Sequence, residues 1–192
     1  MRNLRTLAMS ALIPVALTVA ALAQTAVPPP APPPVPMSLT STSFADGGIV
    51  PDKYTWSVTT PVSPALAWYN APAGTMSFAL ILHDPDVTRM HNSEDYLHWM
   101  VFNIPASAHG FAENLPKDAT LPDGSIQGKA SNGKPGYLGL GAHGNVYHHY
   151  VFELYALDSK LALGPDATRA DLLKAMDGHI LAKAADEGRF HR

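Results

Sequence analysis

Short apolar runs separated by Pro, Gly and Asn dominate the chain after Met37, and this pattern predicts a strand-rich fold. The run at residues 78–82 is apolar at every position, which is typical of a central strand that is covered on both faces. Counting all such runs, we expect strands at residues 38–44, 65–68, 77–83, 97–104 and 147–157.

Only the C-terminal region has the spacing of a helix with one apolar face. The apolar residues at intervals of three and four are Leu172, Leu173, Met176 and Ile180. Thr168, with Asp171 three residues later, matches a helix-capping pattern. We expect Gly178 to divide the region into two helices and Gly188 to end the second one. Strands followed by terminal helices predict a mainly β, α+β fold in which C-terminal helices flank a large central antiparallel or mixed sheet.

The N-terminus has the features of an export signal. Arg2 and Arg5 precede an apolar run at residues 7–22, which ends in the small-residue cleavage motif Ala-Leu-Ala at residues 21–23. We interpret residues 1–23 as a cleaved signal; an uncleaved anchor is the alternative, for which the run is short. The expected location is periplasmic or secreted, with no membrane-spanning segment after cleavage.

Residues 24–36 predict a linker, because seven of the ten residues at 27–36 are proline. Such a segment is either an exposed spacer or a ligand for a proline-binding partner. The remaining residues, 37–192, are sufficient for one ligand-binding domain with a single core.

Charge and cysteine content restrict the function classes. The chain has 13 basic and 16 acidic residues, so removal of Arg2 and Arg5 with the signal leaves a net charge of −5 with histidines neutral. This charge disfavours nonspecific binding to nucleic acid or to an anionic membrane. Because the chain has no cysteine, no disulfide can form and the fold depends on packing.

Polar side chains stand at the ends of three predicted strands, where they would surround one small site. The candidate ligand-binding side chains are Asp84, Asp86, His98, His148 and Tyr150. Gly139 and Gly141 lie in a long glycine-rich segment at residues 106–144, and loops of that length commonly serve a site. Imidazole, phenol and glycine backbone N–H groups together suit an anionic oxygen of phosphate, sulfate or carboxylate.

Strand alternation gives these residues an expected orientation. It places His98 on one face with Met100 and Phe102, and His148 on one face with Tyr150. Asp84 and Asp86 should point the same way if the chain is extended there. The Asp84 carboxylate is expected to accept a hydrogen bond from His98 or His148. The remaining histidines considered, interpreted as loop or surface residues, are His83, His91, His143 and His149.

Several alternatives to anion binding stay open. An Asp–His pair is suited to acid–base catalysis, so an enzyme is the second hypothesis, and an inhibitory or signalling module that acts on another protein is the third. A metal site at Asp84, His98 and His148 ranks below these, because the spacing matches no compact metal motif. Each residue taken alone is also compatible with an ordinary buried polar group. We assign no catalytic residue, metal or cofactor.

An ordered set of short motifs carries a family resemblance from about residue 39 to the end of the chain. The motifs are Ser63-Pro64-Ala65-Leu66-Ala67-Trp68, Ala71-Pro72-Ala73-Gly74-Thr75, Asp84-Pro85-Asp86, His98-Trp99, Asn103-Ile104-Pro105, Gly136-Tyr137-Leu138-Gly139 and the stretch from His148 to Leu157. With them the chain resembles the phosphatidylethanolamine-binding proteins (PEBPs), in particular their bacterial Raf-kinase-inhibitor-like branch.

This resemblance implies one β-rich domain with a large central sheet, a smaller sheet and C-terminal helices. It also implies an anion pocket formed by Asp84, His98, His148 and Tyr150, with Asp86 and the loop at residues 136–144 at its rim. The leading hypothesis is therefore an exported protein that binds a small anionic ligand or a phospholipid headgroup.

Overall fold

The computed structural model describes residues 35–87 and 93–192, so the predicted signal at residues 1–23 and nearly all of the predicted linker lie outside the described residues. The strands are β1 (Ser38–Ser41), β2 (Gly48–Ile49), β3 (Leu66–Tyr69), β4 (Ser77–Asp84), β5 (Tyr96–Pro105), β6 (Gly110–Phe111), β7 (Ile126–Gln127), β8 (His148–Leu157) and β9 (Ile180–Phe190). The helical elements are the 3₁₀ turn η1 (Asp52–Tyr54) and the α-helix α1 (Arg169–Met176). No helix in the described ranges has both the length and the apolar content needed to cross a membrane.

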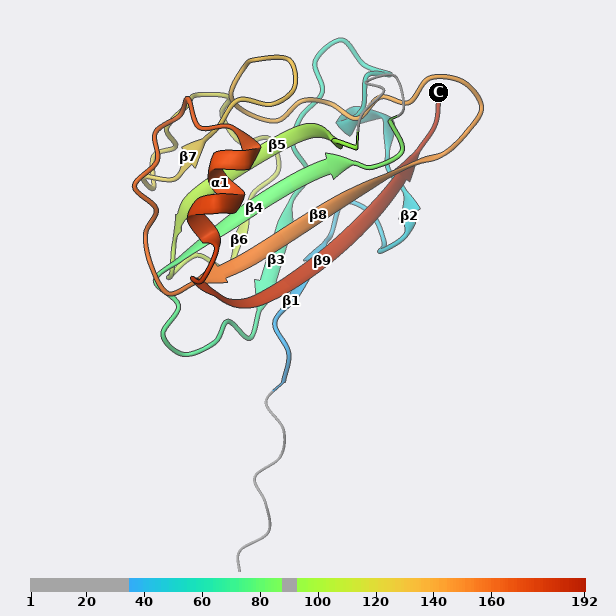
Figure 1. The fold of residues 1–192 in the computed structure, drawn as a ribbon. Coiled ribbons are helices and arrows are strands. Elements are labelled where there is room, and N and C mark those ends of the chain that lie inside the picture. The colour runs from blue at the N-terminus through green and yellow to red at the C-terminus, as the bar shows by residue number, and fades with distance from the viewer. Residues whose placement is uncertain (1–34, 88–92) are drawn as a thin grey trace, which may run out of the picture. The chain divides into compact units, whose positions relative to one another are not determined.

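The strands form two sheets that position α1 and the loops. The large sheet has the order β2-β9-β8-β4-β5-β7; β2 runs parallel to β9 and all other neighbours are antiparallel. The smaller sheet has the antiparallel order β1-β3-β6. The smaller sheet covers one face of the large sheet, and α1 covers the other (Figure 1). The predicted mainly β fold with a mixed central sheet and a smaller sheet is confirmed.

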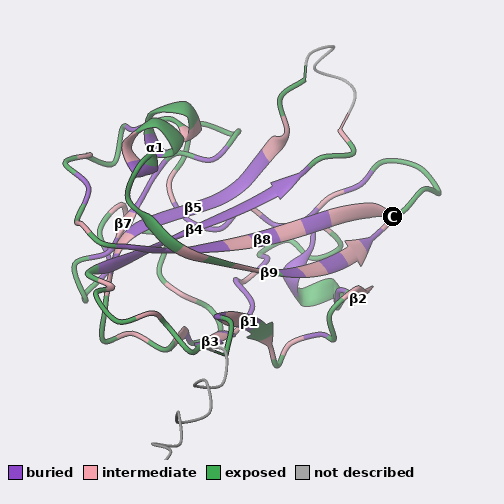
Figure 2. Cartoon of the chain, turned by 60° about the horizontal axis from the view of Figure 1, so that its bottom comes forward, coloured by how far each residue is buried: buried purple, intermediate pink, exposed green. Residues whose placement is uncertain are grey.

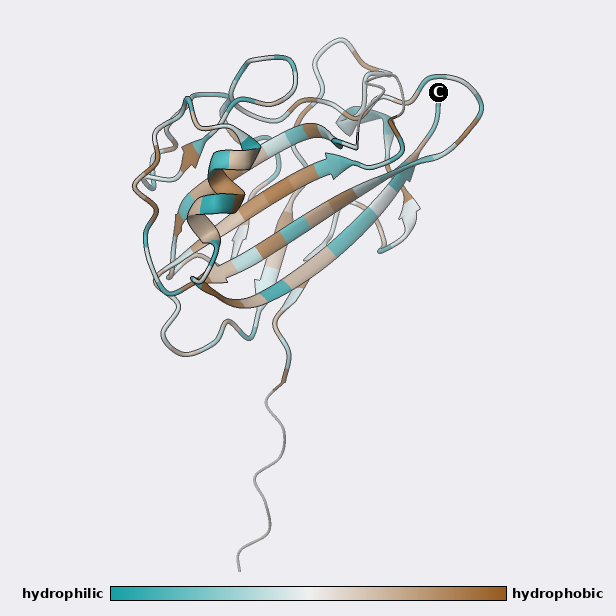
Figure 3. Ribbon diagram, in the orientation of Figure 1, coloured by the Kyte–Doolittle hydropathy of each residue, from teal (hydrophilic) through white to brown (hydrophobic). Residues whose placement is uncertain are grey.

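Strand β4 is buried over its whole length (Figure 2), as its continuous apolar sequence predicts. Phe78, Leu80 and Leu82 pack in the core between the two sheets, whereas Ala79 and Ile81 pack in a second core beneath α1. In Figure 3 the clearly hydrophilic colour on β4 appears at the C-terminal end of the strand. The polar residues that end this strand, His83 and Asp84, therefore lie at the margins of the two cores, one on each face of the sheet.

The prediction of a second C-terminal helix is wrong. Thr168 and Asp171 do form the expected capping box at the start of α1, but after Gly178 the chain becomes strand β9, which pairs with β8 from Ile180 to Phe190. Pairing with a long neighbouring strand outweighs the helix propensity of the alanines in this segment. A Cβ atom on Gly188 would lie 2.3 Å from Val50 Cγ2, so this glycine permits close packing and does not end a helix.

A β-bulge changes the orientation predicted for His98. Leu82 pairs with Trp99 but His83 pairs with Leu97, so His98 is the extra residue on β5. As a result Leu97, and not His98, shares the core beneath α1 with Met100 and Phe102, and the predicted common face for His98, Met100 and Phe102 is wrong. The bulge turns the His98 ring toward Tyr150, in the core between the two sheets.

Candidate functional site

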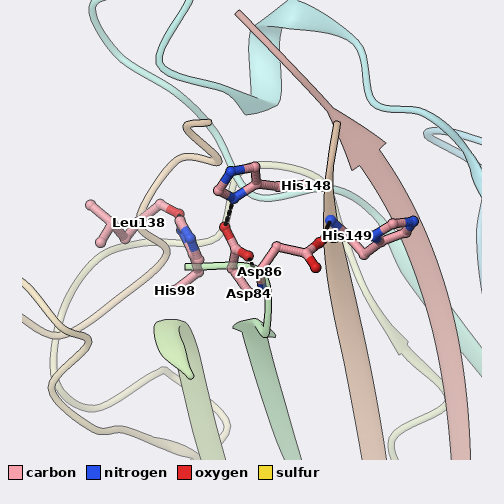
Figure 4. Close-up of polar contacts among 6 residues, drawn as sticks. All are labelled: Asp84, Asp86, His98, Leu138, His148 and His149. Atoms are coloured by element: carbon pink, nitrogen blue, oxygen red, sulfur yellow. Dashed lines mark hydrogen bonds and ion pairs between the residues drawn. The ribbon is translucent and has the colours of Figure 1, made fainter. Parts of the chain in front are cut away.

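The centre of the candidate site is a hydrogen bond between the end of β4 and the start of β8. His148 Nδ1 lies 2.7 Å from Asp84 Oδ2, and the Asp84 side chain is fully buried (Figure 4). The His148 side chain is 16% exposed, so the imidazole lies between the buried carboxylate and the surface. Of the two partners expected for Asp84, His148 is the one found.

A second acid–histidine pair lies beside the first and nearer the solvent. The Asp86 carboxylate accepts hydrogen bonds from the His149 backbone N–H at 2.7 Å and from the His149 ring at 2.8 Å. The Asp86 N–H donates to Asp84 Oδ1 at 2.9 Å, so residues 84–86 form a turn. The extended chain on which the common direction of Asp84 and Asp86 depended is therefore not found. The two carboxylates therefore point to different histidines (Figure 4).

His98 and Tyr150 complete the cluster from β5 and β8. Their rings meet edge to face with centroids 5.3 Å apart, and both residues are buried. His98 Nδ1 lies 3.1 Å from the Leu138 carbonyl oxygen, which fixes the orientation of this ring. The structure thus brings together Asp84, His98, His148 and Tyr150, the four side chains that strand ends and alternation had singled out.

The Tyr150 hydroxyl is a buried polar group of this cluster that no aligned hydrogen bond satisfies. It is fully buried and forms no hydrogen bond of normal geometry with the described residues. Burial raises the pKa of Tyr150 well above its usual range, and the nearby Asp84 charge raises it further, while the Gly141 backbone N–H opposes the change. Buried hydroxyls are seldom left without a partner, so this oxygen marks a place for an additional hydrogen-bonding group.

The pKa values of the two carboxylates are shifted in opposite directions. Burial raises the pKa of Asp84, and the hydrogen bond from His148 only partly offsets that effect. Burial would also raise the pKa of Asp86, but the hydrogen bonds from the His149 backbone and ring outweigh it, so the pKa of Asp86 is lowered. Within residues 35–87 and 93–192, the His, Asp and Glu side chains do not form a group of three or more that is placed to share one metal ion.

Gly139 and Gly141, predicted as backbone donors, lie in a loop packed against Trp56. A Cβ atom on Gly141 would lie 2.2 Å from Trp56 Cε3, and one on Gly139 would lie 2.5 Å from Pro61 Cγ. Glycine is therefore required here for close approach of the backbone to side chains, whatever the loop binds. Sequence reasoning found the glycines but not Trp56, because Trp56 stands in a turn outside every predicted strand.

His83, interpreted from the sequence as a loop or surface residue, is in fact buried, and that interpretation is wrong. It lies on the α1 face of the large sheet, where Nδ1 is 2.7 Å from Asp95 Oδ2 and Nε2 is 3.4 Å from Glu153 Oε2. His143 and His149 are indeed surface residues, and His91 lies outside the described residues.

A cleft of about 630 Å³ lies on this same α1 face, apart from the predicted site residues. Its walls come from the start of β5, the loop around Ser131 and the start of α1. The charges that line it are already paired, Lys129 with Asp166 and Arg169 with Asp95. We place the candidate site at the Asp84–His148 cluster, where Asp84, His98, His148 and Tyr150 come together, and not at this cleft.

The chain is similar to several known proteins over nearly all of the described residues. The family model described as phosphatidylethanolamine-binding protein matches residues 40–191. A UPF0098 protein of Methanothermobacter thermautotrophicus is 42% identical over 156 residues, covering 81% of this chain and 99% of the relative. UPF0098 protein YbhB of Escherichia coli is 31% identical over 163 residues, with coverages of 80% and 99%.

Solved structures agree with the sequence matches. The crystal structure of a putative PEBP homologue from Chlamydia trachomatis superposes with a TM-score of 0.73 at 33% identity, covering 82% of this chain and 98% of that one. The E. coli protein YbcL, titled a new member of the mammalian PEBP family, superposes with a TM-score of 0.74 at 27% identity, with coverages of 82% and 99%. The chain therefore belongs to the phosphatidylethanolamine-binding protein family.

Proposed function

We propose that this protein is an exported binding protein that holds a small anion, such as phosphate, a carboxylate or a phospholipid headgroup, against Asp84, His98, His148 and Tyr150. The observation that carries the proposal is the buried Tyr150 hydroxyl, which no aligned hydrogen bond satisfies although the Asp84 carboxylate and the Gly141 N–H lie beside it. A hydroxyl in such a place is stabilised when an acceptor oxygen enters, and an anionic oxygen is the strongest acceptor. Membership in a family described by the binding of a phospholipid supports a small-ligand role.

The Asp84 carboxylate has a place in an anion site because of what it does to His148. The His148 Nδ1–H donates to Asp84, so Nε2 becomes a donor only when the ring is protonated. A protonated His148 paired with Asp84 is neutral as a pair and presents an N–H to the ligand. Anion affinity should then increase as a falling pH protonates the imidazole.

Location and partners belong to the same proposal. The signal-like pattern at residues 1–23 supports a periplasmic or secreted protein. The acidic net charge supports a ligand held by local donors, not by a broad basic surface, and gives no support to a nucleic-acid partner. A protein partner, the third hypothesis, would require binding outside the Asp84–His148 cluster.

Titration calorimetry with inorganic phosphate, phosphoethanolamine and acetate tests this function. We expect His148→Ala to weaken binding by about tenfold or more, because one charge-assisted hydrogen bond is lost. The matched control is His179→Ala, which removes an exposed histidine whose Nδ1 is 2.8 Å from Asp158. The proposal fails if the wild type binds none of the three probes, or if His148→Ala binds as tightly as the control.

The second candidate function is acid–base catalysis, and the 2.7 Å contact between Asp84 and His148 is what favours it. A carboxylate that orients an imidazole also prepares it for proton transfer. Release of phosphate from a phosphate monoester, present in the wild type and lost in Asp84→Asn, would support an enzyme. Binding without turnover would leave the binding role alone.

A further inference from the structure

The indole of Trp56 lies along the backbone of the loop that borders the Asp84–His148 cluster. Cβ atoms added at Gly141 would meet the six-membered ring, at 2.2 Å from Cε3 and 2.8 Å from Cζ3. One added at Gly139 would meet the five-membered ring, at 2.9 Å from Cδ1. The backbone of residues 139–141 therefore packs along the indole ring of Trp56. Neither Gly139 nor Gly141 has room for a side chain.

Backbone hydrogen bonds hold the same loop from both sides. The Trp56 N–H donates to the Leu140 carbonyl at 2.8 Å, and the Leu140 N–H donates to the Tyr54 carbonyl at 3.2 Å. On the opposite side, the Leu138 N–H donates to the His98 carbonyl at 2.9 Å. The loop thus connects the turn after η1 with the His98 bulge of the candidate site.

The position of this loop decides which backbone group faces Tyr150. The Gly141 backbone N–H acts on the Tyr150 hydroxyl, and Leu140 and Ala142 on either side are buried in the same core as Tyr150. A shift of the loop away from the core would move this N–H away from the hydroxyl. Trp56 is half-buried and makes no contact with Asp84 or His148 among those described, so any influence it has on the site passes through the loop.

We propose that Trp56 is a positioning residue that holds the Gly139–Gly141 segment against the candidate site, so that the Gly141 N–H and the Tyr150 hydroxyl act together on a bound anion. The proposal rests on the anion-binding function proposed above. The two glycines and Trp56 depend on one another, because the indole can pack against this backbone only where residues 139 and 141 have no side chain. The effect of Trp56 on binding is indirect, through the distance between the loop and Tyr150.

A double-mutant cycle tests the contact without any ligand. Gly141→Ala should lower the midpoint of urea unfolding of the full chain, and we expect about half or less of this loss in a Trp56→Ala background, where the colliding ring is absent. The matched control is Gly164→Ala, since Gly164 has open space around its Cβ position and no positive φ angle. Should Gly141→Ala fail to fold, Gly139→Ala takes its place, with a smaller expected recovery because its Cβ would meet Pro61 at 2.5 Å as well as Trp56 at 2.9 Å. Additive losses would overturn the proposed contact.

Calorimetry with inorganic phosphate, run well below each variant's unfolding transition, tests the role in binding. Trp56→Ala should bind phosphate at least about tenfold more weakly, the effect of one misplaced donor, and Trp56→Phe should recover part of that loss. Unchanged phosphate affinity in Trp56→Ala overturns the positioning role even if the cycle shows coupling. Absence of phosphate binding in the wild type overturns the proposed function and the positioning role with it, whereas the cycle still reports the packing separately.

Discussion

Two histidine–carboxylate clusters lie back to back at the end of β4, because neighbouring residues of a strand point to opposite faces. His83 points toward the α1 face, where each of its ring nitrogens faces a carboxylate, that of Asp95 or that of Glu153. Arg169 from α1 adds a third charge at 3.1 Å from Asp95. These contacts are ion pairs rather than aligned hydrogen bonds, and they leave every charge of the cluster opposite another.

Asp84 points toward the other face and forms a cluster of similar residue types with a different outcome. Its carboxylate holds His148, but the adjacent Tyr150 hydroxyl has no hydrogen-bond partner among the described residues. Burial differs between the two faces, because the Asp95 and Glu153 side chains are 25% and 33% exposed whereas that of Asp84 is fully buried. The two clusters differ in the groups that they contain. In the α1-face cluster both His83 ring nitrogens face carboxylates, and Arg169 ties the helix to the sheet. The Asp84 cluster contains the neutral Tyr150 hydroxyl, which is buried without an aligned hydrogen bond and which an entering acceptor would satisfy.

The largest expected loss of stability comes from removing His83 from the α1-face cluster. Replacing His83 by Leu leaves the Asp95 and Glu153 carboxylates facing an apolar side chain, and we expect the free energy of unfolding to fall by about 3 kcal/mol. His179→Ala removes a histidine at a similar distance from its acid, but that pair is exposed, so its loss should be below about 1 kcal/mol. Urea denaturation measures both.

Phosphate affinity should be unchanged in the folded His83→Leu protein, because His83 points away from the candidate site. Equal losses of stability in His83→Leu and His179→Ala would show that the α1-face cluster is not a structural tie. Lost phosphate binding in a stable His83→Leu protein would show that the two faces are coupled.

Removal of the Tyr150 hydroxyl should change the free energy of unfolding in the opposite direction. Tyr150→Phe removes a buried group without a partner, so we expect no loss of stability and a gain of up to about 1 kcal/mol. Tyr137→Phe is the matched control, because the buried Tyr137 hydroxyl donates to the Tyr54 carbonyl at 2.7 Å and its removal should cost about 1 kcal/mol.

Binding separates these two tyrosines further. Phosphate affinity of Tyr150→Phe should fall by about tenfold, because a donor to the anion is lost. Calorimetry and urea denaturation on the same preparations would show stability and affinity moving in opposite directions. A Tyr150→Phe protein that is as destabilised as Tyr137→Phe would mean that the hydroxyl already has a partner.

Much of the site was predictable from the sequence because its residues follow strand rules. Asp84 ends a strand that is apolar on both faces, and His148 with Tyr150 opens another in strict alternation, so both strand ends and their direction followed from period-two counting. His98 escaped this counting, because a bulge depends on the register between two strands and the register is not written in either strand alone.

The features that sequence reasoning missed depend on contacts between distant parts of the chain. His83 looked like a residue at an exposed strand end because Asp95 and Glu153, which surround it, are far from it in sequence. Strand β9 looked helical because its alanines favour a helix locally, and only the partner strand β8 decides otherwise. Trp56 gave no signal, since its role is visible only once two distant glycines lie against its ring.

The smallest expected effect is on the pH dependence of stability, in which the acids of the two clusters should differ. The contact with His83 lowers the pKa of Glu153 below its usual 4.5. The contribution of Glu153 to stability is therefore present above about pH 4.5 and is lost as the pH falls through the lowered folded pKa. Burial raises the pKa of Asp84 above its usual 3.8, so its contribution is present below that value and is lost as the pH rises through the raised folded pKa. The two acids therefore have opposite slopes.

Free energies of unfolding in urea between about pH 3 and pH 7 would separate these slopes. Glu153→Gln should reduce the loss on the acid side, and Asp84→Asn should reduce the loss on the neutral side. Asp171→Asn, whose acid is in the capping box at the exposed start of α1, should change the acid side only slightly. If Asp84→Asn instead reduces the acid-side loss, the carboxylate is stabilised in its charged form by the fold, and the two acids do not have opposite slopes.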